Sequence, residues 1–213
     1  MKEFHIILNG SSVSEVLEKE KKYNAKYPQR RFLLKRWLLG DVDSQTGDIP
    51  AGEGAVSIIG QPPLDGSAAS LWIWMAEDAE VEYRPGLTIA RSDGLEHYIS
   101  AGVVSDGVDS FCQTDGILKS YEDFLAANGM SIETSCVRTW FFCNDIDNNY
   151  AGLVKARREN FEQNGLTADT HYIASTGIAG VPAGGRIVQM DAWAIKGDIE
   201  HKYLYASTHL NPT

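Results

Sequence analysis

The segment from Val137 to Gly180 constrains the fold of this chain more than any other. It begins with Val137–Cys143, where β-branched and aromatic residues occupy both alternating sets of positions, a pattern typical of a strand covered on both faces. Asp147 then offers a carboxylate that can cap the free N–H groups of a first helical turn. Asn164-Gly165 predicts the end of that helix, because glycine adopts the left-handed conformation without a Cβ clash. A buried strand followed by an amphipathic helix is therefore predicted.

This helix carries an arginine within its apolar stripe. The residues at helical spacing are Tyr150, Leu153, Val154, Arg157 and Phe161. Burying an unpaired guanidinium group is costly, so we expect Arg157 to bind a carboxylate. That carboxylate belongs either to a ligand or to the protein itself. The internal candidates are Asp145, Asp147 and Asp191.

The rest of the C-terminal part predicts a mixed sheet with two helices on one face. Leu95–Val104 has the composition of a strand, and the capping-box pattern at Ser110–Gln113 predicts the start of the first helix. Thr176-Gly177 predicts a tight turn, and the glycine-rich 181–186 segment predicts a hairpin turn before a strand at Ile187–Ile195. The fold class is therefore α+β, because one sheet face can cover the apolar stripes of both helices.

Residues 1–84 form a strand-rich N-terminal segment with one helix, which we expect to begin at Ser12 and to end near Lys22. The expected strands are Glu3–Leu8, Phe32–Leu39, Ala55–Gly60 and Ser70–Ala76. The last two are predicted to pair as a long hairpin. Its Trp72 and Trp74 lie on one side of the strand, where they either join the core or form a docking surface.

The charge distribution excludes one class of partner and suggests another. The formal net charge is −10, whereas nucleic-acid-binding domains usually carry a basic surface, so we expect neither binding nor cleavage of RNA. Between Lys19 and Arg36, however, there are eight basic residues. This run is either a solvated face or, in part, the lining of a pocket for a small dianion.

Several other classes of protein are excluded by what the sequence lacks. No apolar run approaches the ~20 residues of a membrane span, and the N-terminus has no signal-peptide core. The histidines have no metal-ligand spacing, and no P-loop or G-x-S-x-G motif is present. Cys112, Cys136 and Cys143 lack CxxC spacing and are expected to be reduced core thiols of a cytoplasmic protein. We expect no metal and no cofactor.

Three short motifs carry a resemblance to a known family. They are R-T-W-x-[YF] at Arg138–Phe142, Tyr150 followed by Arg157 at a spacing of Y-x6-R, and A-[AS]-T-G-I at Ala174–Ile178. In this order they resemble the N-terminal half of the chorismatases, a family of the RidA/YjgF superfamily. The resemblance covers roughly residues 85–213, more than half of the chain.

The resemblance implies a domain organisation. Residues 85–213 would form a RidA/YjgF-like (chorismate-mutase-like) domain of a bacterial protein, preceded by the strand-rich segment of residues 1–84. The tail from Lys202 to Thr213 has the pattern of a strand that enters a Pro-containing linker. In chorismatases the equivalent point leads into a second RidA-like domain, which we expect to be absent from this chain.

The resemblance also implies a function. RidA-type imine deaminases bind the substrate carboxylate with an arginine, and the matching position here is Ser175. Their acidic core residue matches Asp191, which is one methylene shorter than the usual glutamate. These departures argue against deamination and agree with the chorismatases. We expect an N-terminal chorismatase domain that contributes to a chorismate-type small-anion site without being catalytic alone, since the acid that protonates the enol-pyruvyl group belongs to the C-terminal half. The alternative is a non-catalytic RidA-like module for metabolite binding or assembly.

The candidate substrate-binding residues are Arg138, Arg157, Thr176 and Gly177. Each also has a structural interpretation: an internal ion pair for Arg157, an arginine that extends to the sheet edge for Arg138, and a simple turn for Thr176-Gly177. No catalytic residue is assigned. The expected partners are a small anionic metabolite and either a C-terminal RidA-like domain or further copies of the chain.

Overall fold

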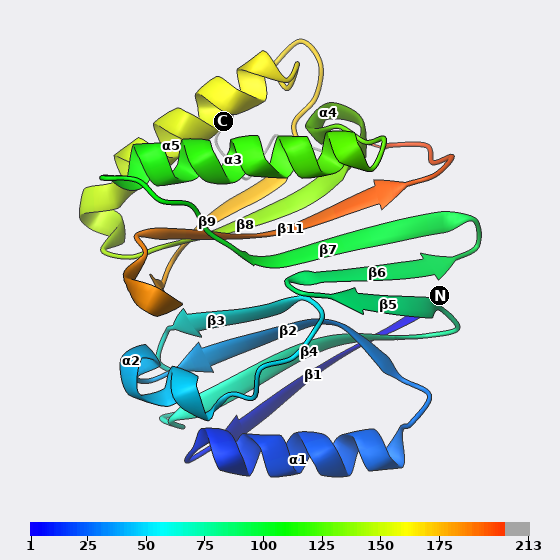
Figure 1. Ribbon diagram of the computed structural model, residues 1–213, viewed down its shortest axis with the longest axis vertical. Helices are drawn as coiled ribbons and strands as arrows, with labels where there is room; N and C mark the ends of the chain where they lie inside the picture. The colour runs from blue at the N-terminus through cyan, green and yellow to red at the C-terminus, as the bar shows by residue number, and fades with distance from the viewer. Residues whose placement is uncertain (203–213) are drawn as a thin grey trace, which may run out of the picture.

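The computed structural model describes residues 1–202, so the tail predicted from Lys202 onward lies almost wholly outside the described residues. Two sheets lie face to face, with α1 on the outside of one and α3 and α5 on the outside of the other (Figure 1). The strands are β1 (Lys2–Gly10), β2 (Arg31–Leu39), β3 (Val56–Gly60), β4 (Ala69–Glu77), β5 (Glu80–Arg84), β6 (Leu87–Ser92), β7 (Leu95–Val103), β8 (Cys136–Cys143), β9 (Ala174–Ala179), β10 (Val181–Pro182) and β11 (Val188–Lys196). The helices are α1 (Val13–Lys26), α2 (Val42–Gln45), α3 (Ser110–Ala127), α4 (Ile132–Ser135) and α5 (Ile146–Gln163), with 3-10 turns η1 (Thr46–Asp48) and η2 (Ala183–Gly185).

Both sheets are mixed. The first sheet has the strand order β1-β4-β2-β3-β10, in which only the β2–β3 pair is parallel. The second sheet has the order β5-β6-β7-β11-β8-β9, in which only β8–β9 is parallel. The first sheet covers the face of the second sheet that the helices leave open (Figure 1). Four layers result, and the two inner ones are sheets.

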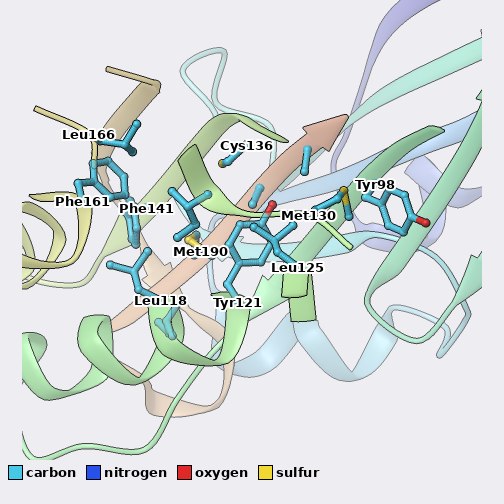
Figure 2. Close-up of a cluster of buried hydrophobic side chains, with 14 of the residues drawn as sticks. Tyr98, Leu118, Tyr121, Leu125, Met130, Cys136, Phe141, Phe161, Leu166 and Met190 are labelled. Carbon is cyan, nitrogen blue, oxygen red and sulfur yellow. The ribbon is translucent and has the colours of Figure 1, made fainter. Parts of the chain in front are cut away.

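The prediction of two helices on one sheet face is confirmed. Leu118 and Leu125 of α3 and Phe161 of α5 pack against Phe141 and Met190 of the second sheet (Figure 2). The two helices approach closely at one glycine. A Cβ atom on Gly152 would lie 2.3 Å from Ser110 Oγ and 3.0 Å from the backbone nitrogen of Phe111.

The helix α1 closes the outer face of the first sheet. It begins after Ser12, whose hydroxyl accepts a hydrogen bond from the backbone N–H of Glu15, as the capping pattern predicts. Val13 and Val16 are buried against the strands. The helix ends at Lys26 rather than near Lys22, and Tyr23 in the added turn packs against the same apolar cluster.

Both predicted caps of the long helices are wrong. The N-terminal cap position of α5 is occupied by Asp145, which has a left-handed backbone conformation (φ 45°). The helix begins at Ile146, so Asp147 lies inside its first turn. The cap of α3 is Asp109, which accepts from the backbone N–H of Cys112 at 2.8 Å. Gln113 is not part of a capping box, because its side-chain oxygen accepts from the backbone N–H groups of Ile187 and Val188.

The predicted hairpin of the third and fourth strands is also wrong. β2 lies between them, with β3 parallel to it and β4 antiparallel. The reason is burial: Leu33, Leu34 and Leu39 of β2 are fully buried, so this strand needs neighbours on both edges and cover on both faces. Trp74 joins the core between the sheets, where its ring meets that of Trp193 edge-on.

Neither of the two turns predicted around residue 180 forms as expected. Thr176 and Gly177 lie within β9, which pairs in parallel with β8. Gly177 is needed there for space, because a Cβ atom would lie 2.5 Å from Cε2 of Tyr150. The 181–186 segment is not a simple hairpin turn, since Val181–Pro182 crosses to the first sheet and pairs with β3 as its edge strand.

Candidate functional site

Arg138 and Thr176 meet on the face of the second sheet that is turned away from the helices. Their strands, β8 and β9, are adjacent, and Arg138 Nη2 donates to Thr176 Oγ1 at 3.2 Å. The guanidinium of Arg138 lies 4.9 Å from the ring centre of Trp140. Its Nε atom is buried without a hydrogen-bond partner, and no carboxylate among residues 1–202 forms an ion pair with Arg138. We call Arg138, Trp140 and Thr176 the Arg138 site.

Arg157 and Gly177 lie on the opposite face of the same strands, towards α5. Arg157 Nη1 donates to Ser175 Oγ at 3.2 Å, and Thr139 donates to the same oxygen at 2.8 Å. Within the described residues, the expectation that Arg157 binds an internal carboxylate is therefore wrong. Its partner there is the Ser175 hydroxyl group. Because side chains alternate along a strand, the four candidate residues form two pairs on opposite faces and do not converge on one ligand.

Asp191 binds a residue that the sequence interpretation missed. Nε and Nη2 of Arg36 donate to Asp191 Oδ2 at 3.0 and 2.6 Å, and the backbone N–H of Gly102 donates to Oδ1 at 3.0 Å. Asp191 is fully buried and Arg36 is 8% exposed. This ion pair connects the two sheets. The run of basic residues from Lys19 to Arg36 was the only sign of Arg36 in the sequence. The interpretation of this run as a solvated face is wrong for Arg36, which is buried.

Aromatic rings enclose the Arg36 guanidinium and connect it to the Arg138 site. The Arg36 carbon Cζ lies 5.0 Å from the ring centre of Trp72, 5.1 Å from that of Trp140 and 4.9 Å from that of Phe142. Trp140 thus contacts two guanidinium groups, one neutralised by Asp191 and one without a carboxylate. Such cation–π contacts hold the indole in a fixed orientation beside the Arg138 guanidinium.

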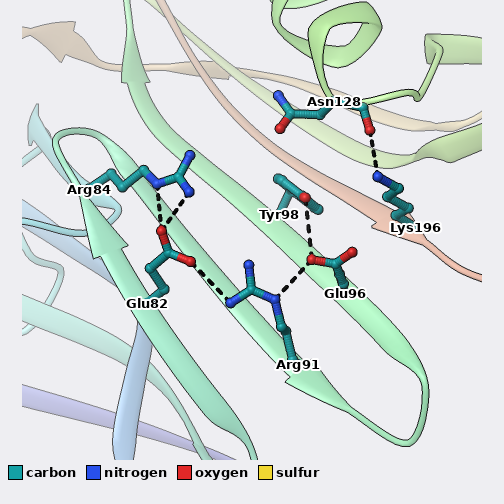
Figure 3. Close-up of polar contacts among 7 residues, drawn as sticks. All are labelled: Glu82, Arg84, Arg91, Glu96, Tyr98, Asn128 and Lys196. Atoms are coloured by element: carbon teal, nitrogen blue, oxygen red, sulfur yellow. Dashed lines mark hydrogen bonds and ion pairs between the residues drawn. The ribbon is translucent and has the colours of Figure 1, made fainter.

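A larger hollow lies elsewhere on the described surface, away from the Arg138 site. It has a volume of about 470 Å³ and is lined by residues 91–96 of the β6–β7 hairpin. Arg91 is its only basic lining residue, and it already binds the carboxylates of Glu82 and Glu96 (Figure 3). This hollow therefore has no cation available for an anionic ligand.

The cysteines and the other titratable groups show no sign of a metal centre. Cys136 and Cys143 are buried, and burial raises the pKa of the Cys136 thiol to about 12. Cys112 is exposed on the first turn of α3, so the expectation of a core thiol is wrong there. Residues 1–202 contain no cluster of His, Cys, Asp and Glu that can hold a metal ion. None of their helices is both long enough and apolar enough to cross a membrane.

Comparisons with known proteins agree on the fold. Neither a protein-family model nor a curated protein sequence matches the chain. A chorismatase crystal structure matches with a TM-score of 0.54 at 15% identity and covers 93% of this chain. This chain spans 55% of the length of that chorismatase.

Smaller proteins of the YjgF family match part of the chain. Rv2704 from Mycobacterium tuberculosis, of the YjgF/YER057c/UK114 family, matches at 22% identity and a TM-score of 0.38, over 50% of this chain and 82% of its own. NMB1025 from Neisseria meningitidis matches at 18% identity and a TM-score of 0.45, over 58% of this chain and all of its own. The likeness to the chorismatase extends over both sheets. The fold of this chain is therefore similar to that of the chorismatase.

Proposed function

We propose that this chain is the N-terminal part of a chorismatase-like protein and that its Arg138 site binds one carboxylate of a small, chorismate-type anion. The observation that carries the proposal is the state of Arg138. Its guanidinium is stacked on Trp140, bound to one hydroxyl and supplied with no carboxylate by residues 1–202. A carboxylate that binds the Nη groups of Arg138 would form charge-assisted hydrogen bonds and neutralise the guanidinium charge.

The charges at the site indicate that one carboxylate is bound here and not two. The positive charge of Arg36 is already neutralised by Asp191. Arg157 lies on the other face of the sheet and cannot reach the same ligand. A dicarboxylate would therefore need a second cation from outside the described residues. This supports a contributing role in a site that is completed by a further domain or by another copy of the chain.

The acids near the site support a binding role and not a catalytic one. Hydrolysis of an enol-pyruvyl ether requires a proton donor aimed at the vinyl carbon. Asp191, on the strand next to Trp140, accepts three N–H groups and serves as an acceptor in the core. The proton donor is therefore assigned to a part of the protein beyond this chain, as the resemblance to chorismatases implies.

Arg138→Gln is expected to weaken chorismate binding by about tenfold to a hundredfold, because a charge-assisted hydrogen bond contributes about 1.5–3 kcal/mol. Isothermal titration calorimetry measures this effect. The matched control is Arg157→Gln, which removes the same charge on the opposite face and is expected to leave the affinity unchanged. Equal losses in both variants, or no loss in Arg138→Gln, would contradict the proposal.

The chain alone is expected to release no pyruvate from chorismate at an enzyme-like rate, because we assign the proton donor to the C-terminal half of a chorismatase-like protein. A coupled pyruvate assay tests this, and turnover on the order of 1 s⁻¹ would place the donor in this chain. Activity that appears only when a second RidA-like domain is added supports the enzyme. Binding without activity in that experiment supports the alternative, a non-catalytic metabolite-binding or assembly module.

A further inference from the structure

A second hollow, of about 280 Å³, lies between α1, β2 and β5. None of its lining residues belongs to the Arg138 site. Its lining includes the cations Arg30, Arg31 and Lys35, the rings of Phe32 and Tyr83, and the carboxylate of Glu20. This volume is close to the lower limit for small-molecule pockets, about 300 Å³. We call it the Arg31 pocket.

The protein neutralises two of the three cations and leaves the third. Lys35 Nζ binds Glu20 Oε1 at 2.6 Å, and the side chain of Glu20 is only 9% exposed. Arg30 binds Glu77 at 3.0 Å. Arg31 forms no ion pair with a carboxylate of residues 1–202, and its nearest aromatic contact is Tyr83, at 5.5 Å. The pocket therefore keeps one uncompensated positive charge at its rim, next to an ammonium group held in place by Glu20.

The apolar side of the pocket is rigid. The rings of Phe32 and Tyr83 are stacked with centres 4.4 Å apart, and the Tyr83 hydroxyl donates to the backbone oxygen of Phe32 at 3.0 Å. Gly54, with φ +96°, lies directly behind them, and a Cβ atom there would be 2.7 Å from Phe32 Cζ and 2.8 Å from Tyr83 Cδ1. A ring pair fixed in this way offers a preformed surface, so little conformational entropy is lost when a ligand binds.

The electrostatic surroundings favour an anion. Between Lys19 and Arg36 the chain has eight basic residues and one acidic residue, Glu20, in a protein of net charge −10. Arg36 is buried between the sheets. The lysines at positions 21, 22 and 26 are exposed on α1, the helix that lines one side of the pocket. Such a local reversal of charge attracts anions to one place on an otherwise acidic surface.

We propose that the Arg31 pocket binds a small phosphate monoester with an aromatic body. The phosphate would bind between the Arg31 fork and the Lys35 ammonium, and the aromatic body would lie against Phe32 and Tyr83. Arg favours phosphate through its paired N–H groups, and Lys adds a point charge. This site is separate from the Arg138 site and does not depend on the function proposed for it.

Titration calorimetry with phenyl phosphate tests the proposal, with inorganic phosphate and benzoate as comparison probes. We expect saturable one-to-one binding of phenyl phosphate that weakens with added salt and is tighter than that of either comparison probe. Equally tight binding of benzoate would show that the second negative charge is not recognised, and equally tight binding of inorganic phosphate would show the same for the ring. Either result, or no saturable binding by the wild-type chain, would overturn the proposal.

Arg31→Gln is expected to weaken phenyl phosphate binding about tenfold, the loss of one charge-assisted contact. Arg31 is exposed, so the variant should keep its melting temperature. The matched control is Lys22→Gln, which removes one charge from an exposed position of α1 outside the pocket lining. An equal loss in Lys22→Gln would mean a diffuse electrostatic effect and would overturn a defined site. Arg138→Gln should leave phenyl phosphate binding unchanged, which separates this test from that of the proposed function.

Discussion

Replacing Arg36 by methionine is expected to destabilise the protein by about 3–5 kcal/mol, because it leaves the Asp191 carboxylate buried without its cation. Asp191 is fully buried, and Arg36 supplies two of the three hydrogen bonds to its carboxylate. The pair also lies between the sheets, so its loss weakens the contact between the first and second sheets. The urea concentration at the midpoint of unfolding measures the loss, since the free energy of unfolding falls by about 1–3 kcal/mol per molar urea.

A second variant separates the loss of the pair from the loss of apolar packing around it. In Arg36→Met/Asp191→Asn the buried charge is gone, while the amide oxygen of residue 191 can still accept from the backbone N–H of Gly102. Replacement of a buried ion pair by neutral groups is often close to neutral in stability. We therefore expect the double variant to recover much of the stability that Arg36→Met loses. A loss of less than about 1 kcal/mol in Arg36→Met would contradict the assigned role of the pair.

Phe141→Ala is expected to cost about 3–5 kcal/mol, since it removes a fully buried ring and leaves a cavity. Phe141 lies on β8, among the side chains through which α3 and α5 pack against the second sheet (Figure 2). The milder change Phe141→Leu keeps most of the volume and is expected to cost about 1 kcal/mol. Thermal or urea unfolding of both variants gives the comparison. Equal losses of stability in the two variants would mean that the neighbouring side chains fill the space around the alanine. The volume of the ring would then not determine the stability.

The sequence predicted those parts of the fold that local patterns determine. The helices α3 and α5 and the strand β8 follow from apolar spacing over short windows, and Asn164-Gly165 marks the end of α5. The order of the strands in the first sheet could not be predicted in this way. Adjacent strands were expected to pair, whereas the two-sided burial of β2 places it between β3 and β4. Burial of both faces is a property of the whole layer arrangement, which no short window contains.

The candidate site was predictable only in part, for the same reason. Arg138 and Thr176 were both identified as candidates, and the parallel pairing of β8 with β9 brings them together. Arg157 and Gly177 lie on the opposite face of the same strands, and this placement depends on the pairing of β8 with β9. It could not be predicted because Thr176-Gly177 was expected to form a turn and not part of a strand. Arg36 and Asp191 are 155 residues apart in the chain. A contact at that distance leaves no local pattern, apart from the basic pair Lys35-Arg36 between apolar residues of β2.

The edge strand β10 has a consequence for the order in which the protein is made. The strands β1 to β4 are complete once residue 77 has been synthesised, but their sheet gains its last strand only when residues 181 and 182 emerge. At about 5–20 residues per second, this interval of about 100 residues lasts roughly 5–20 s on the ribosome. Throughout that time the free edge of β3 presents unpaired backbone N–H and C=O groups. During synthesis, this edge is open to pairing with a strand from a neighbouring nascent chain.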